Sequence, residues 1–442
     1  MATPTRLPVE PLLVILGSTG TGKSELAVEL AKRFRGEVIN SDAMQMYTGL
    51  PIMTNKVTVT EMCGIPHHLL GHVSLRDTPW TVDNFRREAT KVIDEIRDRG
   101  NLPIVVGGTN YYVDALLFSD VILDERYPND EPLPVLEEST EFLFQELKKV
   151  DPKMALQWHP NDRRKIMKSL EIYLRTGRRA SDIYAEQQER RSAGIRDSPW
   201  QNLLFWVYSD REVLKARLDA RVDKMLEAGL MDEVRELLDF KREEEAAGRA
   251  VDLSRGIWQS IGYKQLEPYV LAQEEDKTGE GLEQLRITCV EEMKAQTRQY
   301  AKEQIKWTRR KGIQRLVQEG PDAVDSLYVL DTTDVSRFQD TAVEPAARLT
   351  EQFLRGEPRM HPEELSELAR TTLSDAKRGS PEQTPCDKTC DLCGITVVTE
   401  ERWRDHLRSR MHRARWKKKK RLAVVPVEDT PREPSEPESE NI

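Results

Sequence analysis

Residues 12–24 read Leu12-Leu13-Val14-Ile15-Leu16-Gly17-Ser18-Thr19-Gly20-Thr21-Gly22-Lys23-Ser24, five apolar residues that lead directly into a G-x-x-x-x-G-K-S loop. Apolar residues recur with helical spacing after the loop, so it lies between a predicted strand and a predicted helix, as this motif requires. In that setting backbone N–H groups bind phosphate oxygens at the helix N-terminus. The loop therefore predicts a di- or triphosphate site in which Lys23 adds a positive charge and Ser24 can hold Mg²⁺. The predicted phosphate-binding residues are Gly17, Ser18, Thr19, Gly20, Thr21, Gly22, Lys23 and Ser24.

Two more polar segments follow predicted strands. The strand at residues 37–40 leads into Asp42, and the strand at residues 102–106 leads into two glycines and Thr109. A helix is predicted between these strands, at residues 80–99. The alternation of strands and helices predicts an α/β fold, a P-loop NTPase-like parallel sheet flanked by helices. Because ligands bind beyond the carboxyl ends of such strands, we expect the three polar segments to meet in one cleft.

Asp42 is the candidate general base, because it follows a strand one loop away from the phosphate site. The alternative is a helix N-cap, since a Ser-Asp pair commonly begins a helix. Thr109 can offer a hydroxyl to the same cleft. Arg217 and Arg221 are four residues apart on one face of a predicted helix, from which they could reach a bound diphosphate. Their alternative role is surface pairing with the acidic residues of the same helix, Asp219, Asp223 and Glu227.

The rest of the chain changes character several times. Helical patterns at residues 143–150 and 166–174 are separated by loops rich in Pro, Asp and Arg, and strands are predicted at residues 203–208 and 326–331. A charged stretch at residues 241–255 is expected to be loop-like. The predicted organisation is a first part of the P-loop core at 10–120, a helical insertion at 121–200, a second part of the core at 201–350, a linker at 351–385, a zinc finger at 386–416 and a basic, then acidic and disordered tail at 417–442.

The cysteines and histidines near the C-terminus have the spacing of a metal site. Cys390-x2-Cys393-x12-His406-x5-His412 places two thiolates on a short knuckle and two imidazoles on a predicted helix at residues 402–413. Four such ligands close a tetrahedral, structural Zn²⁺ site, and a segment this small needs the metal to fold. Cys386 is an alternative ligand.

The neighbourhood of this site is strongly basic. Residues 402–421 hold eleven Lys or Arg against one Asp, and the spacing of the two histidines resembles that of zinc fingers that bind structured RNA. The basic block favours a nucleic-acid partner over the alternatives of a protein-binding finger or a nuclear localisation signal.

Bulk properties narrow the class of protein. The net charge of −9 argues against a basic nucleic-acid coat, and no apolar run is long enough for a membrane span. The N-terminus lacks the pattern of a secretory signal. Five cysteines, three of them clustered, indicate a metal site in a reducing compartment rather than a disulfide framework. We expect a cytoplasmic monomer, with nuclear and mitochondrial pools left open.

An ordered set of motifs carries a resemblance to a known family. After the phosphate loop come 40–47 (NSDAMQMY), 64–68 (GIPHH), 105–109 (VVGGT), 159–165 (HPNDRRK), 221–226 (RVDKML), 260–264 (SIGYK) and 297–302 (TRQYAK). This set, in this order over roughly residues 12–312, resembles the tRNA dimethylallyltransferase (tRNA isopentenyltransferase) family. The added zinc finger resembles the one found in eukaryotic members of this family.

The resemblance implies a reaction. A dimethylallyl group would move from dimethylallyl diphosphate to N6 of adenosine 37, beside the tRNA anticodon. Asp42 would deprotonate the amine, Thr19 would lie beside the prenyl donor, and Mg²⁺ on Ser24 with Arg217 and Arg221 would neutralise the leaving diphosphate.

The resemblance also implies two sets of RNA contacts. Asp42, Ala43, Met44, Gln45 and Thr109 would hold the target nucleotide, and Arg163, Arg164, Lys165 and Lys168 would bind the anticodon stem-loop. Bacterial members tend to read Gln-Arg-x-x-Arg where this chain has Arg164-Lys165-x-x-Lys168. Two other functions fit parts of the sequence, a small-molecule or nucleotide kinase and a non-catalytic RNA-binding protein.

Overall fold

The computed structural model describes residues 10–118, 133–192, 200–275, 278–377 and 384–422. The chain divides into two compact units. One, here called the sheet unit, consists of Met1–Arg126 and Gln187–Gly379, and the other, here called the finger unit, consists of Tyr127–Glu186 and Ser380–Ile442. The acidic tail predicted to be disordered lies outside the described residues, as do residues 121–132 and 193–199 of the predicted insertion.

A six-stranded parallel sheet is the centre of the sheet unit, which confirms the predicted α/β class. Its spatial order is β3-β2-β4-β1-β5-β6, with Val14 of β1 paired to Val105 of β4 on one side and Leu204 of β5 on the other. The central position of β1 explains its unbroken apolar run, since both of its faces are covered. The strands are β1 (Pro11–Gly17), β2 (Gly36–Asn40), β3 (His67–His68), β4 (Leu102–Val106), β5 (Gln201–Tyr208) and β6 (Leu327–Asp331).

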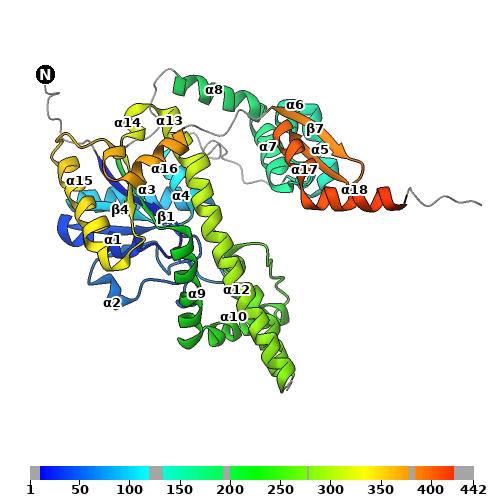
Figure 1. The fold of residues 1–442 in the computed structure, drawn as a ribbon, viewed down its shortest axis with the longest axis horizontal. Helices are drawn as coiled ribbons and strands as arrows, with labels where there is room; N and C mark the ends of the chain where they lie inside the picture. The colour runs from blue at the N-terminus through cyan, green and yellow to red at the C-terminus, as the bar shows by residue number, and fades with distance from the viewer. Residues whose placement is uncertain (1–9, 119–132, 193–199, 276–277, 378–383, 423–442) are drawn as a thin grey trace, which may run out of the picture. The chain divides into compact units, whose positions relative to one another are not determined.

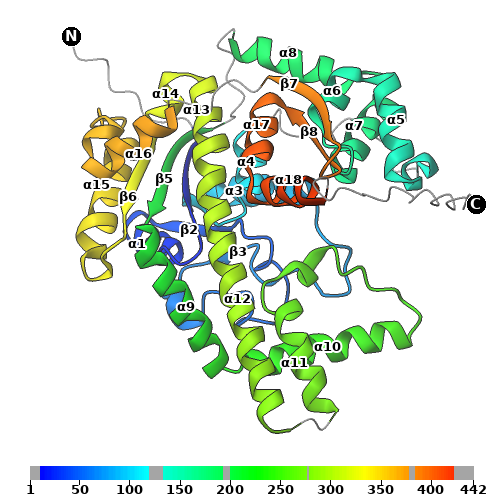
Figure 2. The same ribbon diagram turned by 45° about the vertical axis from the view of Figure 1, so that its right-hand side comes forward.

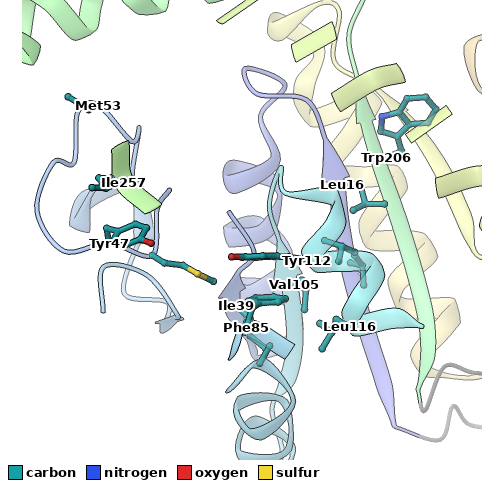
Figure 3. Packing of buried hydrophobic residues seen from close by; sticks show 14 of the residues in the cluster. Leu16, Ile39, Tyr47, Met53, Phe85, Val105, Tyr112, Leu116, Trp206 and Ile257 are labelled. Atoms are coloured by element: carbon teal, nitrogen blue, oxygen red, sulfur yellow. The ribbon is translucent and has the colours of Figure 1, made fainter. Parts of the chain in front are cut away.

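Alternate residues of β1 enter two separate cores. Leu12 and Val14 pack with α3 (Val82–Asp98) and α4 (Asn110–Leu117), where Phe85 and Tyr112 stack with ring centroids 4.6 Å apart. Leu13 packs on the opposite face with α1 (Lys23–Phe34) and α15 (Glu344–Leu354). Figure 1 shows α1 and α15 together beside the sheet, and Figure 3 shows Phe85 and Tyr112 next to Ile39 and Val105. This two-sided burial leaves the carboxyl edge of the sheet as the place where polar loops gather.

A group of long helices extends the sheet unit beyond that edge. α9 (Arg211–Glu227) and α12 (Glu280–Trp307) lie against each other, and α11 (Tyr263–Glu274) packs on both α12 and α10 (Leu230–Ala246) (Figure 2). The remaining elements of this unit are short or lie near its ends: α2 (Val59–Met62), η4 (Gly256–Gln259), η5 (Thr308–Gly312), α13 (Ile313–Glu319), α14 (Pro321–Val324), η6 (Val335–Arg337), η7 (Gln339–Val343), η8 (Pro362–Glu364) and α16 (Glu367–Lys377).

The finger unit combines two segments that are far apart in the sequence. The described insertion residues are helical, as predicted, and its helix α6 packs on strand β7 near the C-terminus. β7 and β8 form an antiparallel hairpin. The elements are η3 (Pro134–Glu137), α5 (Thr140–Val150), α6 (Pro152–Gln157), α7 (Arg163–Thr176), α8 (Ala180–Ser192, which continues past the unit boundary), β7 (Pro385–Cys390), β8 (Ile395–Thr399), α17 (Glu400–Arg408) and α18 (Arg410–Leu422).

Two stretches differ from the sequence prediction. The segment 351–385, predicted to be a linker, contains α16, whose Ala369, Leu373 and Ala376 are buried in the core beside the sheet. Their spacing of three or four residues marks one face of an amphipathic helix. The charged stretch from 241 is likewise helical as far as Ala246, because α10 continues through it. Among the described residues, no helix is both long enough and apolar enough to cross a bilayer.

Candidate active site and metal centre

The phosphate loop runs from the end of β1 to the start of α1. Thr21 Oγ1 and Lys23 Nζ both donate hydrogen bonds to the carbonyl oxygen of Ser18, at 2.9 and 2.8 Å, and these bonds fold the loop back on itself. Gly22, with φ +87°, precedes α1, and a Cβ atom there would lie 2.8 Å from the ring of Phe338. The side chain of Ser24 is exposed in the first turn of α1. The loop is therefore preformed, with Ser24 open to a ligand.

Asp42 lies in a turn directly after β2. Residues 43–46 form turns, so the N-cap interpretation of Asp42 is wrong. Its Oδ1 accepts the Met44 N–H at 3.0 Å, and its own N–H donates to Asn40 Oδ1 at 3.0 Å. The first of these bonds orients the carboxylate, with a further backbone hydrogen bond from Gln45, and the second fixes the backbone of Asp42.

Asp42 and Lys23 interact electrostatically at the mouth of the loop. Burial raises the pKa of Asp42, against the opposing effects of the Met44 N–H and the Lys23 charge. Burial lowers the pKa of Lys23 to about 8, with Asp42 acting to raise it and Arg221 to lower it. The structure therefore places a carboxylate of raised proton affinity beside the predicted phosphate site, where a general base would be needed.

The loops after β2 and β4 meet at the same edge. Thr109 Oγ1 accepts the Ala43 N–H at 3.0 Å, and a Cβ atom on Gly107 would collide with Ser41. Gln45 extends this surface, and its amide donates to the Asn55 carbonyl at 3.1 Å. The predicted meeting of the three polar segments is thus confirmed in this structure.

The two arginines of α9 point to the phosphate loop rather than to surface acids. Arg221 donates to Thr19 Oγ1 at 2.7 Å. Arg217 donates to the carbonyl of Gly20 at 3.3 Å and to the carbonyls of Thr332 and Thr333 at 3.0 Å each. Arg221 therefore lies in the cradle itself, whereas Arg217 fastens the outside of the loop to the end of β6.

The alternative role of the arginines, surface pairing within α9, does not hold for Asp219 and Asp223. Asp219 pairs with Arg298 at 2.5 Å, and Asp223 pairs with Lys294 at 2.7 Å. Both cations belong to α12, so these ion pairs join α9 to α12 and leave the arginines for the loop.

Sequence reasoning missed Gln304 and Tyr300 on α12. Gln304 is buried and contacts both the phosphate loop and the loop after β4. Tyr300 is 38% exposed as a whole, but desolvation of its hydroxyl and the Asp42 charge raise its pKa, and the hydroxyl hydrogen-bonds with Thr109 and Gln304. One signal was available: Gln304 continues a buried stripe of α12 formed by Met293, Thr297 and Ala301, where an apolar residue is expected.

The four predicted RNA-binding cations lie in the first turns of α7. Arg163 donates to the carbonyls of Leu136, at 2.8 Å, and Glu138, at 2.5 Å. Arg163 therefore holds η3 against α7. The other three cations have more accessible positions: Lys165 pairs with Asp162 and lies over the Trp158 ring, Lys168 pairs with Glu171, and Arg164 is exposed.

The predicted metal ligands form one cluster. The nearest ligand atoms of Cys390, Cys393, His406 and His412 all lie within 4.8 Å of one another. His412 Nδ1 is 3.5 Å from Cys390 Sγ, and His406 Nε2 is buried without a hydrogen-bond partner among the described residues. A buried imidazole nitrogen of this kind fits metal ligation. Cys386 stands outside the cluster, and its thiol donates to the Val397 carbonyl at 3.8 Å.

The two histidines do not share one helix, so the predicted helix at 402–413 is wrong in one respect. α17 ends at Arg408 and α18 begins at Arg410, with extended Ser409 (φ −65°, ψ 151°) between them. Residues six apart on a continuous helix differ by about 240° around its axis, so both could not face one ion. Ser409 makes the turn, and its Oγ accepts the His412 N–H at 3.1 Å.

Comparisons with known proteins find one family. A family model described as IPP transferase matches residues 45–311. The tRNA dimethylallyltransferase of Schizosaccharomyces pombe is 38% identical over 435 residues, which cover 94% of this chain and 97% of that protein. The tRNA dimethylallyltransferase of Homo sapiens is 34% identical over 423 residues, which cover 93% of this chain and 87% of that protein.

Solved structures give a similar result. A crystal structure of a eukaryotic dimethylallyltransferase acting on tRNA matches with a TM-score of 0.76 at 34% identity, covering 94% of this chain and 98% of that one. The tRNA isopentenylpyrophosphate transferase of Bacillus halodurans matches with a TM-score of 0.51 at 30% identity, covering 82% of this chain and all of that one.

Proposed function

The chain belongs to the IPP transferase family, and we propose that it moves a dimethylallyl group from dimethylallyl diphosphate to N6 of adenosine 37 in tRNA. The relatives are enzymes that modify tRNA, and this membership confirms the resemblance in the sequence motifs. The observation that supports the site assignment best is that Asp42 interacts electrostatically with Lys23 and Arg221, at the edge where the Ala43 N–H also bonds to Thr109 Oγ1. In the proposed reaction, Asp42 would serve as the base for the amine and Lys23 as part of the cradle for the leaving group.

In the proposed reaction, the bond from C1 of the prenyl group to the diphosphate oxygen breaks as the N6–C1 bond forms. Negative charge then accumulates on the diphosphate. The loop N–H groups, Lys23 and Arg221 stabilise that charge, and because they are held in place before substrate arrives, little reorganisation is needed.

The N6 amine is a weak nucleophile, and it loses one proton as it is alkylated. Asp42 takes that proton. Its raised pKa makes it a stronger base than an exposed aspartate. The Met44 N–H fixes the orientation of the carboxylate. Thr109 and Gln45, which lie at the same edge, would contact the target nucleotide, which must leave its stack to reach the site.

Two metals belong to this proposal. Mg²⁺ would be held by the exposed Ser24 hydroxyl together with the diphosphate, and it would neutralise charge on the leaving group. Zn²⁺ would occupy the cluster of Cys390, Cys393, His406 and His412, where two thiolates and two imidazoles match its preference for four closed ligands. There it would stabilise the fold of the finger unit.

We also assign RNA affinity to the finger unit. Arg164, on the insertion, and the exposed cations of α17 and α18 would bind the phosphates of the anticodon stem-loop without reading its sequence. This contribution is electrostatic, so it should weaken steeply as salt increases.

The test uses the purified chain and a tRNA transcript that carries adenosine 37. One reaction receives dimethylallyl diphosphate labelled in the prenyl group, and a parallel reaction receives ATP labelled in its terminal phosphate. We expect label from the prenyl donor on the RNA, and none when adenosine 37 is replaced by guanosine. Transfer of phosphate from ATP, with no prenylation of RNA, would overturn the proposal and assign the loop to a kinase.

A further inference from the structure

We propose that Gln304 is a positioning residue, which sets the spacing between the phosphate loop and the loop after β4. The inference rests on the proposed function, because those loops would hold the prenyl donor and the acceptor nucleotide. Gln304 does not reach either substrate in this proposal. It acts through the backbone of Thr19 and Gly108, one residue on each loop.

Both ends of the Gln304 amide are used. Its Oε1 accepts the Thr19 N–H at 2.9 Å, and its Nε2 donates to the Gly108 carbonyl at 2.9 Å. The two partners fix which end of the amide is which, since one is a donor and the other an acceptor. The side chain is therefore a bridge of defined length between the two loops.

The base of this bridge is rigid. Gln304 is only 5% exposed, and its own carbonyl accepts from Asn110 Nδ2 at 3.3 Å and from Thr308 Oγ1 at 3.1 Å. The backbone changes from α to π geometry at Thr308, one turn after Gln304. A short π-helical segment of this kind often occurs at functional sites, and here it follows the anchored turn.

The two loops carry the groups on which the reaction depends. Thr19 Oγ1 accepts from Arg221, next to the phosphate site, and Thr109, adjacent to Gly108, receives the N–H of Ala43 beside Asp42. A shift of either loop would therefore change the distance between the donor carbon and the acceptor amine. A displacement of about 1 Å in such an arrangement can cost on the order of 10²-fold in rate.

The glycine at position 108 supports this role. A Cβ atom on Gly108 would collide with Gln304 Nε2, whereas the carboxylate of Asp42 would be at an ordinary contact distance of 3.5 Å. Gly108 has no left-handed φ that would exclude alanine. Gly108→Ala is therefore expected to act by displacing the Gln304 amide.

The first experiment measures single-turnover prenylation with the full chain at saturating donor and RNA. For Gln304→Leu we expect a rate about 10²-fold lower than wild type, with the Kd of each substrate changed less than threefold. The matched control is Gln299→Leu on the same helix, whose exposed amide bonds only to Glu303 among the described residues, and which should leave the rate unchanged.

Gln304→Glu adds a second measurement, the pH dependence of the rate, which would not change if Gln304 had only a structural role. The introduced carboxyl can accept from Thr19 in either form, but it can donate to the Gly108 carbonyl only when protonated. The rate relative to wild type should therefore recover as pH falls. This variant keeps the shape of glutamine, so it also supplies the measurement if Gln304→Leu does not fold.

The last step is a double-mutant cycle. Gly108→Ala should lower the rate in the wild-type background and have little further effect in Gln304→Ala, because the group that it displaces is gone. Additive losses would overturn the inference, as would a Gln304→Leu variant that folds and reacts within threefold of wild type. A wild-type chain that transfers no prenyl group would instead overturn the proposed function, and this inference with it.

Discussion

The phosphate site and the metal cluster are assembled in opposite ways. The residues around the phosphate loop come from positions as distant as Thr19 and Gln304, and the sheet and α12 bring them together. The four metal ligands lie within residues 390–412, where one hairpin and two short helices bring them together. Hydrogen bonds from Gln304 join two loops of the first site, although Ser18 Oγ and Arg221 Nε there have no partner among the described residues. At the second site the buried His406 Nε2 has no partner among the described residues, as fits a metal ligand.

This difference suggests a division of work. A site held by packing can keep its geometry through binding and release, as transfer chemistry requires. A segment held by a metal can present exposed cations with little core of its own, which suits sequence-independent RNA binding. Chemistry and RNA affinity should therefore be lost separately when each region is damaged.

The largest expected effect is on chemistry. Asp42→Asn keeps the shape of the side chain and removes its basicity, so kcat should fall by about 10²- to 10⁴-fold, the usual contribution of a general base. The Kd for tRNA, measured by filter binding, should stay within threefold of wild type. Asp94→Asn, an exposed carboxylate on α3, is the matched control. A fall in kcat of less than tenfold would remove Asp42 from the role of base.

The opposite result is expected from the metal centre. A chelator should release one equivalent of zinc from the wild-type chain, and Cys390→Ser should prevent zinc from binding. Either treatment should weaken tRNA binding by about 10²-fold, which is the order of affinity lost when one of two linked binding regions fails. kcat at saturating tRNA should be unchanged. Cys63→Ser, at an exposed cysteine of the sheet unit, controls for the loss of a thiol. A large loss of kcat with an unchanged Kd for tRNA would contradict the assignment of RNA affinity to the finger unit and of chemistry to the sheet unit.

The sequence predicted these two regions unequally. The ligand set of the finger was predictable because all four residues are local, and the structure brings them together as expected. The break at Ser409 was missed because the helical pattern continues on both sides of it. Two features account for it: Ser409 caps the start of α18 through the His412 N–H, and both histidines then face one cluster.

In the active site, the residues placed by the sheet topology were predictable, whereas a residue contributed by a distant helix was not. The phosphate loop, Asp42 and Thr109 were predictable, since strand order places strand ends at one edge. Gln304 was not, because it is 196 residues away from Gly108, and its role depends on how α12 crosses the sheet unit. α16 was missed for a simpler reason: its polar residues outnumber the short apolar stripe that binds it to the core.

The smallest expected effect is on the pH dependence of the affinity for dimethylallyl diphosphate. Lys23 has a pKa of about 8 in the free protein because it is buried, and a bound diphosphate must raise that pKa by its negative charge. Below pH 8 Lys23 is already protonated, so it adds no pH dependence to donor binding. Above pH 8 binding must take up a proton, and the affinity for dimethylallyl diphosphate should fall about tenfold per pH unit.

Calorimetry in buffers of different ionisation enthalpy would measure this proton uptake directly. Lys23→Arg is the control, because a guanidinium stays charged and should remove the break at pH 8. Lys56, whose pKa burial also lowers to about 8, would leave the break in place in that variant if it were the group responsible. RNA binding is assigned to the finger unit and not to Lys23, so the Kd for tRNA without donor should not show the same break. A common break in both affinities would mean that the phosphate loop and the RNA-binding surface are not separate, and the division between the two regions would fail.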